Sequence, residues 1–334
     1  MKSILFTTTA LVAFAGAAAA DGHTSVSFAG EASVEYNSES LDGYSTAAEM
    51  TATGSATLDN GLTASTSLTI DAVAGTISAG SISLSSDTAS VTFGTELDGA
   101  VFTAVGDDYD IGDDGEENIV EGVVASVTMG ETTLTVSAPV IAETIETADV
   151  EVGVNTTAAG WALGFGLADG EYAMTAAGTA GGADVSFGMA SNDEWDAGVS
   201  YTAGTVTVSA STDEAEAWTV GAAYAADGVS AGIEYNADET WEITAGYAAD
   251  GITVAAAFTD ASVMTLGATY DMGNGLTVGA GLEDEDTYAF ASYDLGGGAN
   301  AFVDYTDAAA ALEEVGPSER DIATGTTVGV SFTF

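Results

Sequence analysis

The chain has no cysteine and almost no basic side chains: its 334 residues include two Lys or Arg, one His and 52 Asp or Glu. Without cysteine there are no disulfides, so hydrogen-bonded pairing and packing must hold the fold together. Nucleic acid is excluded as a partner, because phosphate binding depends on Lys and Arg. A formal charge of −50 repels itself unless salt screens it or cations bind, so the surface is expected to attract cations.

Groups that perform catalysis are equally scarce. His23, the single histidine, lies close to the N-terminus, where a frayed end is the ordinary interpretation. A cysteine nucleophile, a second histidine for a metal motif and a lysine beyond Lys2 are all missing. Carboxylate pairs that could cleave glycosides arise by chance among 52 acids. The sequence therefore predicts that the protein is not an enzyme.

Long apolar runs are missing except at the N-terminus. Lys2, an apolar stretch over 4–15 and the small residues Ala18 to Ala20 predict a secretory signal peptide over 1–20, with the mature chain starting at Asp21. Loss of Lys2 takes the formal charge from −50 to −51. Elsewhere Gly, Thr, Ser, Asp and Glu interrupt every apolar run, which excludes a helical membrane protein. Residues 21–334 are predicted to form one domain, because the strand pattern described below is uninterrupted.

An aromatic repeat is the strongest pattern in the chain. Five tyrosines lie 23 residues apart, and three tryptophans keep the same interval: Tyr201, Tyr224, Tyr247, Tyr270, Tyr293, Trp195, Trp218 and Trp241. A period in this range indicates a repeated supersecondary unit. Here the unit is predicted to be a β-hairpin, because period-two alternation runs from Trp218 to Tyr235 on both sides of Asp227-Gly228.

Turn chemistry distinguishes the two ends of the predicted hairpins. One set of turns is short and glycine-rich, and the tyrosines precede it; the other set is acidic, and the tryptophans follow it. The only prolines, Pro139 and Pro317, are predicted to lie outside the strands, since proline cannot donate to a ladder. Aromatic side chains are thus expected in two rows, one at each end of the sheet.

Two aromatic rows fit a barrel that crosses a membrane, where girdles mark both headgroup levels. Nine residues at ~3.3 Å each, tilted by about 40°, give roughly 23 Å of height, close to the lipid-facing band of such barrels. Alternation on the segment 241–247 agrees, since Trp241 and Ile243 are apolar while Glu242 and Thr244 are polar. The predicted fold class is all-β: a transmembrane antiparallel up-and-down β-barrel with an even number of strands, roughly 16 to 22.

The C-terminus carries the most specific signal. Val328, Val330 and Phe332 alternate with small polar residues, and the chain ends on the aromatic Phe334. With the segment 293–299 and the exported start, this ending resembles the outer-membrane porins of the Rhodobacter type found in alphaproteobacteria. The resemblance implies a general-diffusion porin in the outer membrane of a Gram-negative bacterium, a homotrimer that passes small hydrophilic solutes by passive diffusion. It also implies that a long loop, here 96–118, folds into the barrel and narrows the channel.

Within that loop seven carboxylates fall in eleven residues, and they are the candidate constriction residues: Asp107, Asp108, Asp110, Asp113, Asp114, Glu116 and Glu117. In a constriction they would favour cations, as charged rings do in other pores. The alternative is a solvated acidic loop on the outer surface. Asp110, Asp114 and Glu121 half-match a calcium-binding loop, so loose binding of Ca²⁺ or Mg²⁺ by oxygen ligands is a further hypothesis; no other cofactor is expected.

Strand parity identifies a second group of acids as candidates for the channel wall: Glu31, Glu35, Asp196, Glu234, Glu242 and Asp304. They are predicted to make the wall negative; the alternative is that acids near strand ends only keep the rims wet. Arg320, the only basic residue after Lys2, is expected in the last long external segment, in contact with neighbouring acids.

A different class of protein also fits some of these features. A secreted acidic β-solenoid, structural or adhesive in function, could have 23-residue coils and bind Ca²⁺ through its turns. Solenoids favour Asn or Gln ladders and nonapeptide Gly-Asp repeats, whereas this chain has no Gln and no such run. Two aromatic rows have no role in a solenoid, so the sequence favours the cation-preferring porin.

Overall fold

The computed structural model describes residues 24–39, 43–105, 118–141, 144–145, 149–315, 317 and 320–334. The chain divides into two compact units, Met1–Ala29 with Glu49–Gly198, and Gly30–Ala48 with Val199–Phe334, called here units 1 and 2. Strands β1 (Thr24–Asn37), β2 (Tyr44–Thr57) and β13 (Trp195–Ala203) each contribute residues to both units. In the described part of the chain, no helix is long and apolar enough to cross a membrane.

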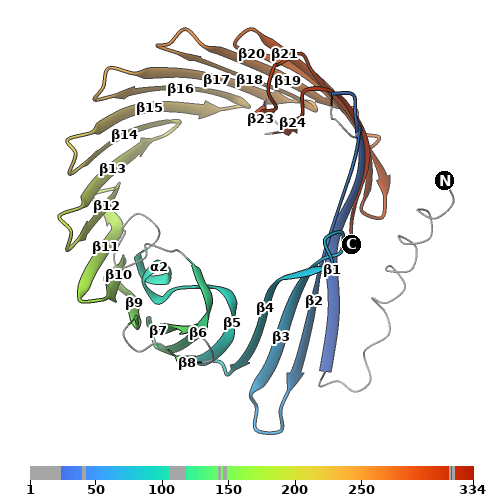
Figure 1. Ribbon diagram of the computed structural model, residues 1–334. Helices are drawn as coiled ribbons and strands as arrows, with labels where there is room; N and C mark the ends of the chain where they lie inside the picture. Colours follow the sequence, from blue (N-terminus) through green and yellow to red (C-terminus); the bar gives the residue numbers. More distant parts are fainter. Residues whose placement is uncertain are drawn as a thin grey trace, which may run out of the picture. The chain divides into compact units, whose positions relative to one another are not determined.

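Unit 1 is an antiparallel meander in which each long strand pairs with the next, from β2 to β12 (Figure 1). Its elements after β2 are β3 (Thr63–Asp71), β4 (Thr76–Ser85), β5 (Ala89–Asp98), α2 (Ala100–Val105), β6 (Asn118–Met129), β7 (Thr132–Ile141), β8 (Thr144–Ile145), β9 (Glu151–Ala158), β10 (Trp161–Ala168), β11 (Glu171–Ala180) and β12 (Ala183–Ala190). The short β8 pairs with the end of β7 only, and β9 pairs with the rest of it.

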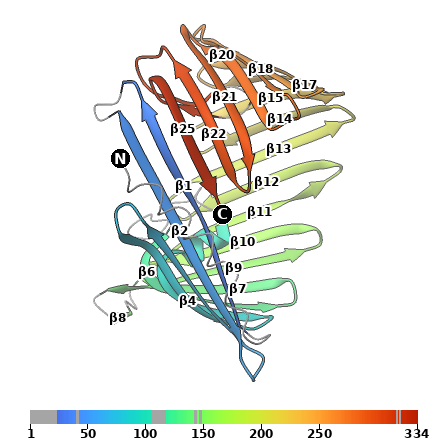
Figure 2. The ribbon, with the colours of Figure 1, turned by 90° about the vertical axis from the view of Figure 1, so that its right-hand side faces the viewer.

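Unit 2 is also an antiparallel meander, in which each strand pairs with the next from β14 to β22. Its elements are β14 (Val206–Asp213), β15 (Trp218–Ala226), β16 (Val229–Asn236), β17 (Trp241–Ala249), β18 (Ile252–Thr259), β19 (Met264–Asp271), β20 (Leu276–Glu283), β21 (Asp286–Gly296), β22 (Ala299–Thr306), β23 (Leu312–Val315), β24 (Arg320–Ile322) and β25 (Gly325–Thr333). The last long strand, β25, pairs with β22 on one side and with β1 on the other (Figure 2).

Pairing of sequence neighbours, together with pairing of the last strand to the first, is the hydrogen-bond pattern of an antiparallel up-and-down β-barrel. The predicted all-β fold class is confirmed. Without the short β8, β23 and β24, 22 of the 25 described strands remain, an even number at the upper end of the predicted range. Antiparallel hairpins between sequence neighbours are not the stacked coils of a solenoid, so the alternative fold is not favoured.

The 23-residue aromatic repeat corresponds to one pair of consecutive antiparallel strands with its turns. Trp195, Trp218 and Trp241 each begin a strand just after an acidic turn, and the tyrosines lie near the glycine-rich turns at the other end. In the turn between β15 and β16, Asp227 and Gly228 have φ of 53° and 79°. Two successive positive φ angles define a type I′ turn, whose twist matches that of the flanking strands. This geometry explains the Asp-Gly pair.

The structure corrects the expectation that Pro139 lies outside the strands. It lies inside β7 and pairs with Gly122 of β6. On the other edge of β7, pairing with β9 stops at Ser137. A proline that lacks its N–H is tolerated where the ladder on one side has ended.

Candidate functional site

Cross-strand register divides each unit into a polar face and an apolar face. In unit 1 the polar face is rich in serine and threonine, and hydroxyls opposite each other hydrogen-bond across neighbouring strands: Thr51 to Thr69 at 2.9 Å, Ser65 to Ser83 at 2.9 Å, Ser90 to Ser126 at 2.9 Å and Thr128 to Thr133 at 3.0 Å. Such pairs satisfy part of the wall's hydrogen-bonding capacity without any charge, while the hydroxyls keep lone pairs for water. The face suits contact with water.

Helix α2 begins two residues after β5, inside the predicted constriction loop, and packs on the polar face of β9 and β10 (Figure 1). The Ser137 hydroxyl, only 1% exposed, accepts a hydrogen bond from the Ala100 N–H at 2.8 Å and donates one to Glu151 Oε2 at 2.8 Å. The same carboxylate oxygen accepts from the Val101 N–H at 3.2 Å. Two N–H groups at the start of the helix are therefore satisfied by side chains of β7 and β9.

Three glycines allow the helix to approach the sheet. A Cβ on Gly153 of β9 would collide with the Ala100 carbonyl, and one on Gly164 of β10 would collide with the Ala104 carbonyl. Beside them, a Cβ on Gly166 would lie 3.0 Å from Val101 Cγ1. At the other end of the helix, Asn155 Nδ2 donates to the Thr103 carbonyl at 2.7 Å. The backbone of α2 thus rests directly on the backbone of the sheet.

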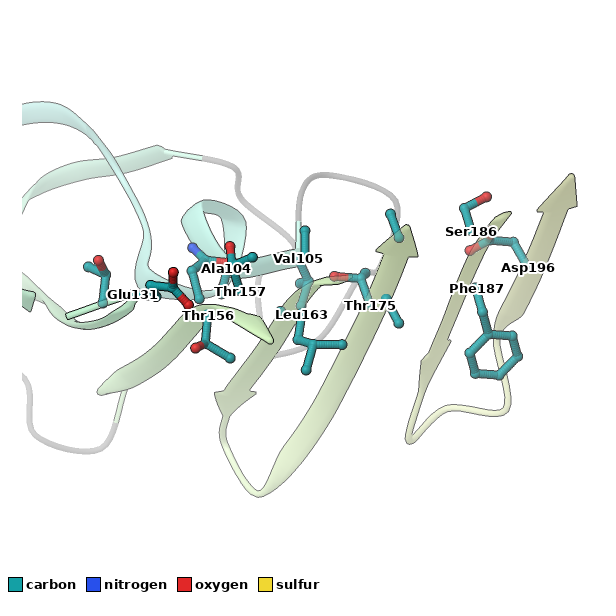
Figure 3. Close-up of a pocket in the computed structure, with 16 residues that line it drawn as sticks. Ala104, Val105, Glu131, Thr156, Thr157, Leu163, Thr175, Ser186, Phe187 and Asp196 are labelled. Atoms are coloured by element: carbon teal, nitrogen blue, oxygen red, sulfur yellow. The ribbon is translucent and has the colours of Figure 1, made fainter. Parts of the chain in front are cut away.

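A hollow lies beside the helix on the strands of unit 1. Ala104 and Val105 border it on the helix side, and Thr175, Ser186 and Asp196 border it on the sheet side (Figure 3). Asp196, a predicted wall acid, therefore borders the same hollow as α2, on its sheet side. The predicted constriction acids between Asp107 and Glu117 follow α2 in sequence but lie outside the described residues. Of the predicted calcium ligands only Glu121 is described; it is exposed on β6 opposite Thr95, and no group of three potential metal ligands occurs in the described chain.

The other predicted wall acids lie on the polar face of unit 2. Glu234 of β16 and Glu242 of β17 are direct cross-strand partners and border a hollow with Thr207, Ser209 and Thr244. Two carboxylates opposite each other repel, so their placement disfavours anions and favours a counter-cation. Register also places the remaining three on this face: Glu31, Glu35 and Asp304. Asp304 is 4% exposed, whereas Glu234 and Glu242 are exposed.

The aromatic rows lie on the apolar face, as parity requires. Trp218 packs against Tyr235 with ring centroids 5.8 Å apart, and Trp241 packs against Phe258 at 5.6 Å. At the opposite strand ends the tyrosines are exposed to a similar degree, from 41% for Tyr224 to 48% for Tyr201. Phe334 follows β25 and is 37% exposed. Exposed aromatic side chains at both ends of an apolar face are suited to the two headgroup levels of a bilayer.

A second segment covers the polar face, and the sequence did not predict it. Between β22 and β25 the chain forms the inner hairpin, defined here as residues 307–322, in which β23 pairs with β24. Its Ala308, Leu312 and Ile322 form a buried cluster with Tyr288 and Phe290 of β21. Register places both rings on the polar face, so two aromatic side chains in polar positions of β21 were the available signal.

Asp307 fixes the base of the inner hairpin. Its Oδ1 accepts hydrogen bonds from the Thr287 N–H at 2.6 Å and the Thr287 hydroxyl at 3.0 Å. These bonds lower the pKa of the Asp307 carboxyl below its ordinary value of 3.8. A lowered pKa means that the stabilisation is fully present above pH 3.8 and is lost only as the pH falls through the lowered value. The anchor therefore persists at neutral pH.

Loss of the Glu151 carboxylate is expected to loosen α2. In Glu151→Ala the Val101 N–H and the Ser137 hydroxyl lose their acceptor, which costs about 1–3 kcal/mol. We expect an added protease to cleave α2 in the detergent-solubilised protein roughly tenfold faster, as for a segment that opens more often. Glu239→Ala removes the same charge from an exposed turn of unit 2 and serves as the control. Equal cleavage of the two variants would show that Glu151 does not hold the helix.

Comparison with known proteins identifies the family. The family model described as Gram-negative porin matches residues 7–288, so the chain belongs to that family. The family indicates an outer-membrane channel rather than an enzyme. None of the curated proteins matches the chain.

Solved structures give weaker matches. A mutant of the Rh. blastica porin is 15% identical over 93% of this chain and 100% of its own, with a TM-score of 0.32. An anion-selective porin from Comamonas acidovorans is also 15% identical with the same coverage and a TM-score of 0.35. A loop-deletion mutant of OmpT, an outer membrane protein of Vibrio cholerae, is 10% identical with the same coverage and a TM-score of 0.35. At these scores the likeness adds nothing to the family assignment.

Proposed function

We propose that the protein forms a water-filled, cation-preferring channel for the passive diffusion of small hydrophilic solutes. The observation that carries the proposal is the sign of the charge on the polar face. Every charged residue that register places there, including Glu151, Glu234 and Glu242, is acidic, and the described chain contains one basic residue, Arg320. A wall with negative charges alone concentrates cations and repels anions.

The uncharged part of the polar face supports unselective passage of small solutes. Serine, threonine, glycine and alanine make up most of it, and none of these side chains reaches far enough to hold one solute tightly. The hollow at Glu234 and Glu242 is bordered mostly by small residues, among them Thr207, Gly221 and Ala223, which would not hold one particular solute. Transport is then driven by concentration differences.

Narrowing of the channel is assigned to the loop that contains α2. The helix lies on the polar face, held by Ser137, Glu151 and Asn155, and the constriction acids follow directly after Val105. Docking of α2 supports the entry of residues 107–117 into the channel, where their carboxylates would strengthen the cation preference. Loose binding of Ca²⁺ or Mg²⁺ by Asp110, Asp114 and Glu121 is part of the same proposal, because clustered carboxylate oxygens suit hard cations.

The proposal also covers assembly, origin and export. We propose a homotrimer in the outer membrane of an alphaproteobacterium, exported with removal of residues 1–20. The apolar face, with exposed Val199, Val220 and Ile243 among others, provides surface for lipid and for neighbouring subunits. Cross-linking in outer-membrane vesicles tests the trimer, and the mass of the mature chain tests the removal of residues 1–20.

Reversal potentials in planar bilayers under a KCl gradient test the cation preference. We expect the wild type to pass K⁺ in preference to Cl⁻, more strongly in dilute salt, because the Debye length lengthens from about 10 Å at 0.1 M to about 30 Å at 0.01 M. The double variant Glu234→Gln/Glu242→Gln removes the facing carboxylates and should lower the permeability ratio roughly twofold.

The matched control is Glu239→Gln with Glu214→Gln, which removes the same charge from exposed acidic turns. If the wall variant and the turn variant change the ratio equally, the wall acids have no special role. Anion preference of the wild type, or an absence of conductance, would contradict the proposed function itself.

A further inference from the structure

We propose that the inner hairpin is a second pore-narrowing element, built on the polar face of β21 and β22 and independent of the loop that contains α2. The proposal rests on the channel function argued above. It assigns to the segment before the last strand a role in limiting ion flow and in setting charge selectivity. In Figure 1, β23 and β24 lie on the concave side of the strands of unit 2.

Burial shows that the hairpin is docked on the sheet. Ile322 is fully buried, Ala308 is 2% exposed and Leu312 is 9% exposed, although the segment is short. An external loop in water has nothing to bury such side chains against. Here they contact Tyr288 and Phe290, which are 4% and 6% exposed. Removing this apolar area from water is the force that holds the hairpin against the wall.

The wall is shaped to receive the hairpin. Tyr288 lies over Gly281 of β20 and Phe290 lies over Gly279, because a Cβ on either glycine would strike the ring. Each ring therefore occupies the space beside a glycine of the neighbouring strand. Two bare aromatic rings would leave a large apolar surface in an aqueous channel, since each ring buries roughly 150–250 Å² when covered. The inner hairpin is the cover.

The base of the hairpin turns it toward the polar face. Thr306, the last residue of β22, donates its hydroxyl to the Thr287 carbonyl at 3.0 Å and accepts from the Ala308 N–H at 3.1 Å. With the bonds from Thr287 to Asp307, these contacts fix the first two residues after the strand. The chain leaves β22 in a defined direction, so the hairpin is part of the wall rather than a free loop.

The position and charge of the hairpin give it a function. A layer of chain on the polar face reduces the open cross-section in front of β20 to β22. The segment carries five acids, Asp307, Glu313, Glu314, Glu319 and Asp321, against one base, Arg320. Its net charge is therefore negative, and it adds to the cation preference. Arg320, at the start of β24, brings the only basic residue of the mature chain to this element.

Thiol accessibility tests whether the hairpin is docked, separately from any transport. Because the chain has no cysteine, single substitutions report one site each. We expect Ile322→Cys to react with a charged, membrane-impermeant thiol reagent at least about tenfold more slowly than Ala311→Cys, which lies at an exposed position of the same segment. Equal rates would overturn the docking, even where the wild type conducts normally.

Conductance tests the effect on ion flow. Leu312→Ser/Ile322→Ser removes the apolar contacts of the hairpin but leaves the strands intact, and Ala311→Ser is the matched control. We expect the double variant to raise single-channel conductance by about 1.5-fold or more and to lower the cation preference, with no change in the control. Fast thiol labelling of Leu312→Ser/Ile322→Cys would show that the hairpin is released from the sheet. If it is released and the conductance of the double variant is unchanged, the proposed narrowing is overturned. A wild type that does not conduct would overturn the channel function instead.

Discussion

Gly153→Ala is expected to displace α2 from the sheet and to raise the conductance of the channel, although it adds a single methyl group. The new Cβ would overlap the Ala100 carbonyl and press on Ala104 Cβ. Both are part of the helix, so no flexible side chain can move aside. Overpacking of this kind costs about 1–3 kcal/mol. That is comparable to the few hydrogen bonds that hold α2, so the helix rather than the sheet is expected to give way.

The measurement is single-channel conductance, with cleavage of α2 by an added protease as a second readout. Gly54→Ala is the matched control: it makes the same change in a strand of the same unit, where the new Cβ would be 3.4 Å from Thr66 Cγ2, an ordinary contact. We expect the control to behave as the wild type. Normal conductance and normal protease resistance of Gly153→Ala would show that α2 does not narrow the channel.

The strands could be predicted because their signals are local. Alternation and turn residues act within one hairpin, so Trp218 to Tyr235 and the Asp227-Gly228 turn could be interpreted without knowledge of the rest of the chain. Parity then assigned Glu234 and Glu242 to the polar face, and the register places them there as direct partners. Parity alone could not show that the two carboxylates lie opposite each other, because that depends on the register between strands.

The two covering segments could not be predicted because their contacts are distant in sequence. The docking of α2 depends on Glu151 and Gly164, about fifty and sixty residues after the helix, and a glycine in a strand has many explanations. For the inner hairpin a signal did exist, because Tyr288 and Phe290 occupy positions of β21 that belong to the polar face. Large aromatic side chains on a predicted polar face require a cover, and the following loop offers three large aliphatic residues, Leu312, Val315 and Ile322.

Removal of the last five residues, Val330 to Phe334, is expected to abolish assembly in the outer membrane. These residues hold β25 to two neighbours: Val330 to Phe332 pair with Ala299 to Ala301 of β22, and Val330 to Thr333 pair with residues 31–34 of β1. The last residue extends the pairing, because the Phe334 N–H donates to the Gly30 carbonyl at 3.0 Å and the Gly30 N–H donates to the Phe334 carbonyl at 2.9 Å.

Truncation leaves backbone groups of β1 and β22 without partners at the depth of the bilayer, where each unsatisfied group costs several kcal/mol. Few proteins have more than about 15 kcal/mol of stability in total, so the loss cannot be absorbed. The measurement is the amount of heat-modifiable, folded protein in isolated outer membranes, compared with total protein in the cell. We expect no folded band for the truncated chain.

Phe334→Leu separates the two contributions of the terminus, the backbone ladder and the aromatic ring. It keeps every main-chain hydrogen bond of Phe334 and an apolar side chain on the apolar face, but it removes the ring. If the ladder dominates, this variant assembles almost as well as the wild type while the truncated chain does not. Equal loss in both variants would assign the requirement to the ring, and normal assembly of the truncated chain would show that the β25–β1 pairing is dispensable.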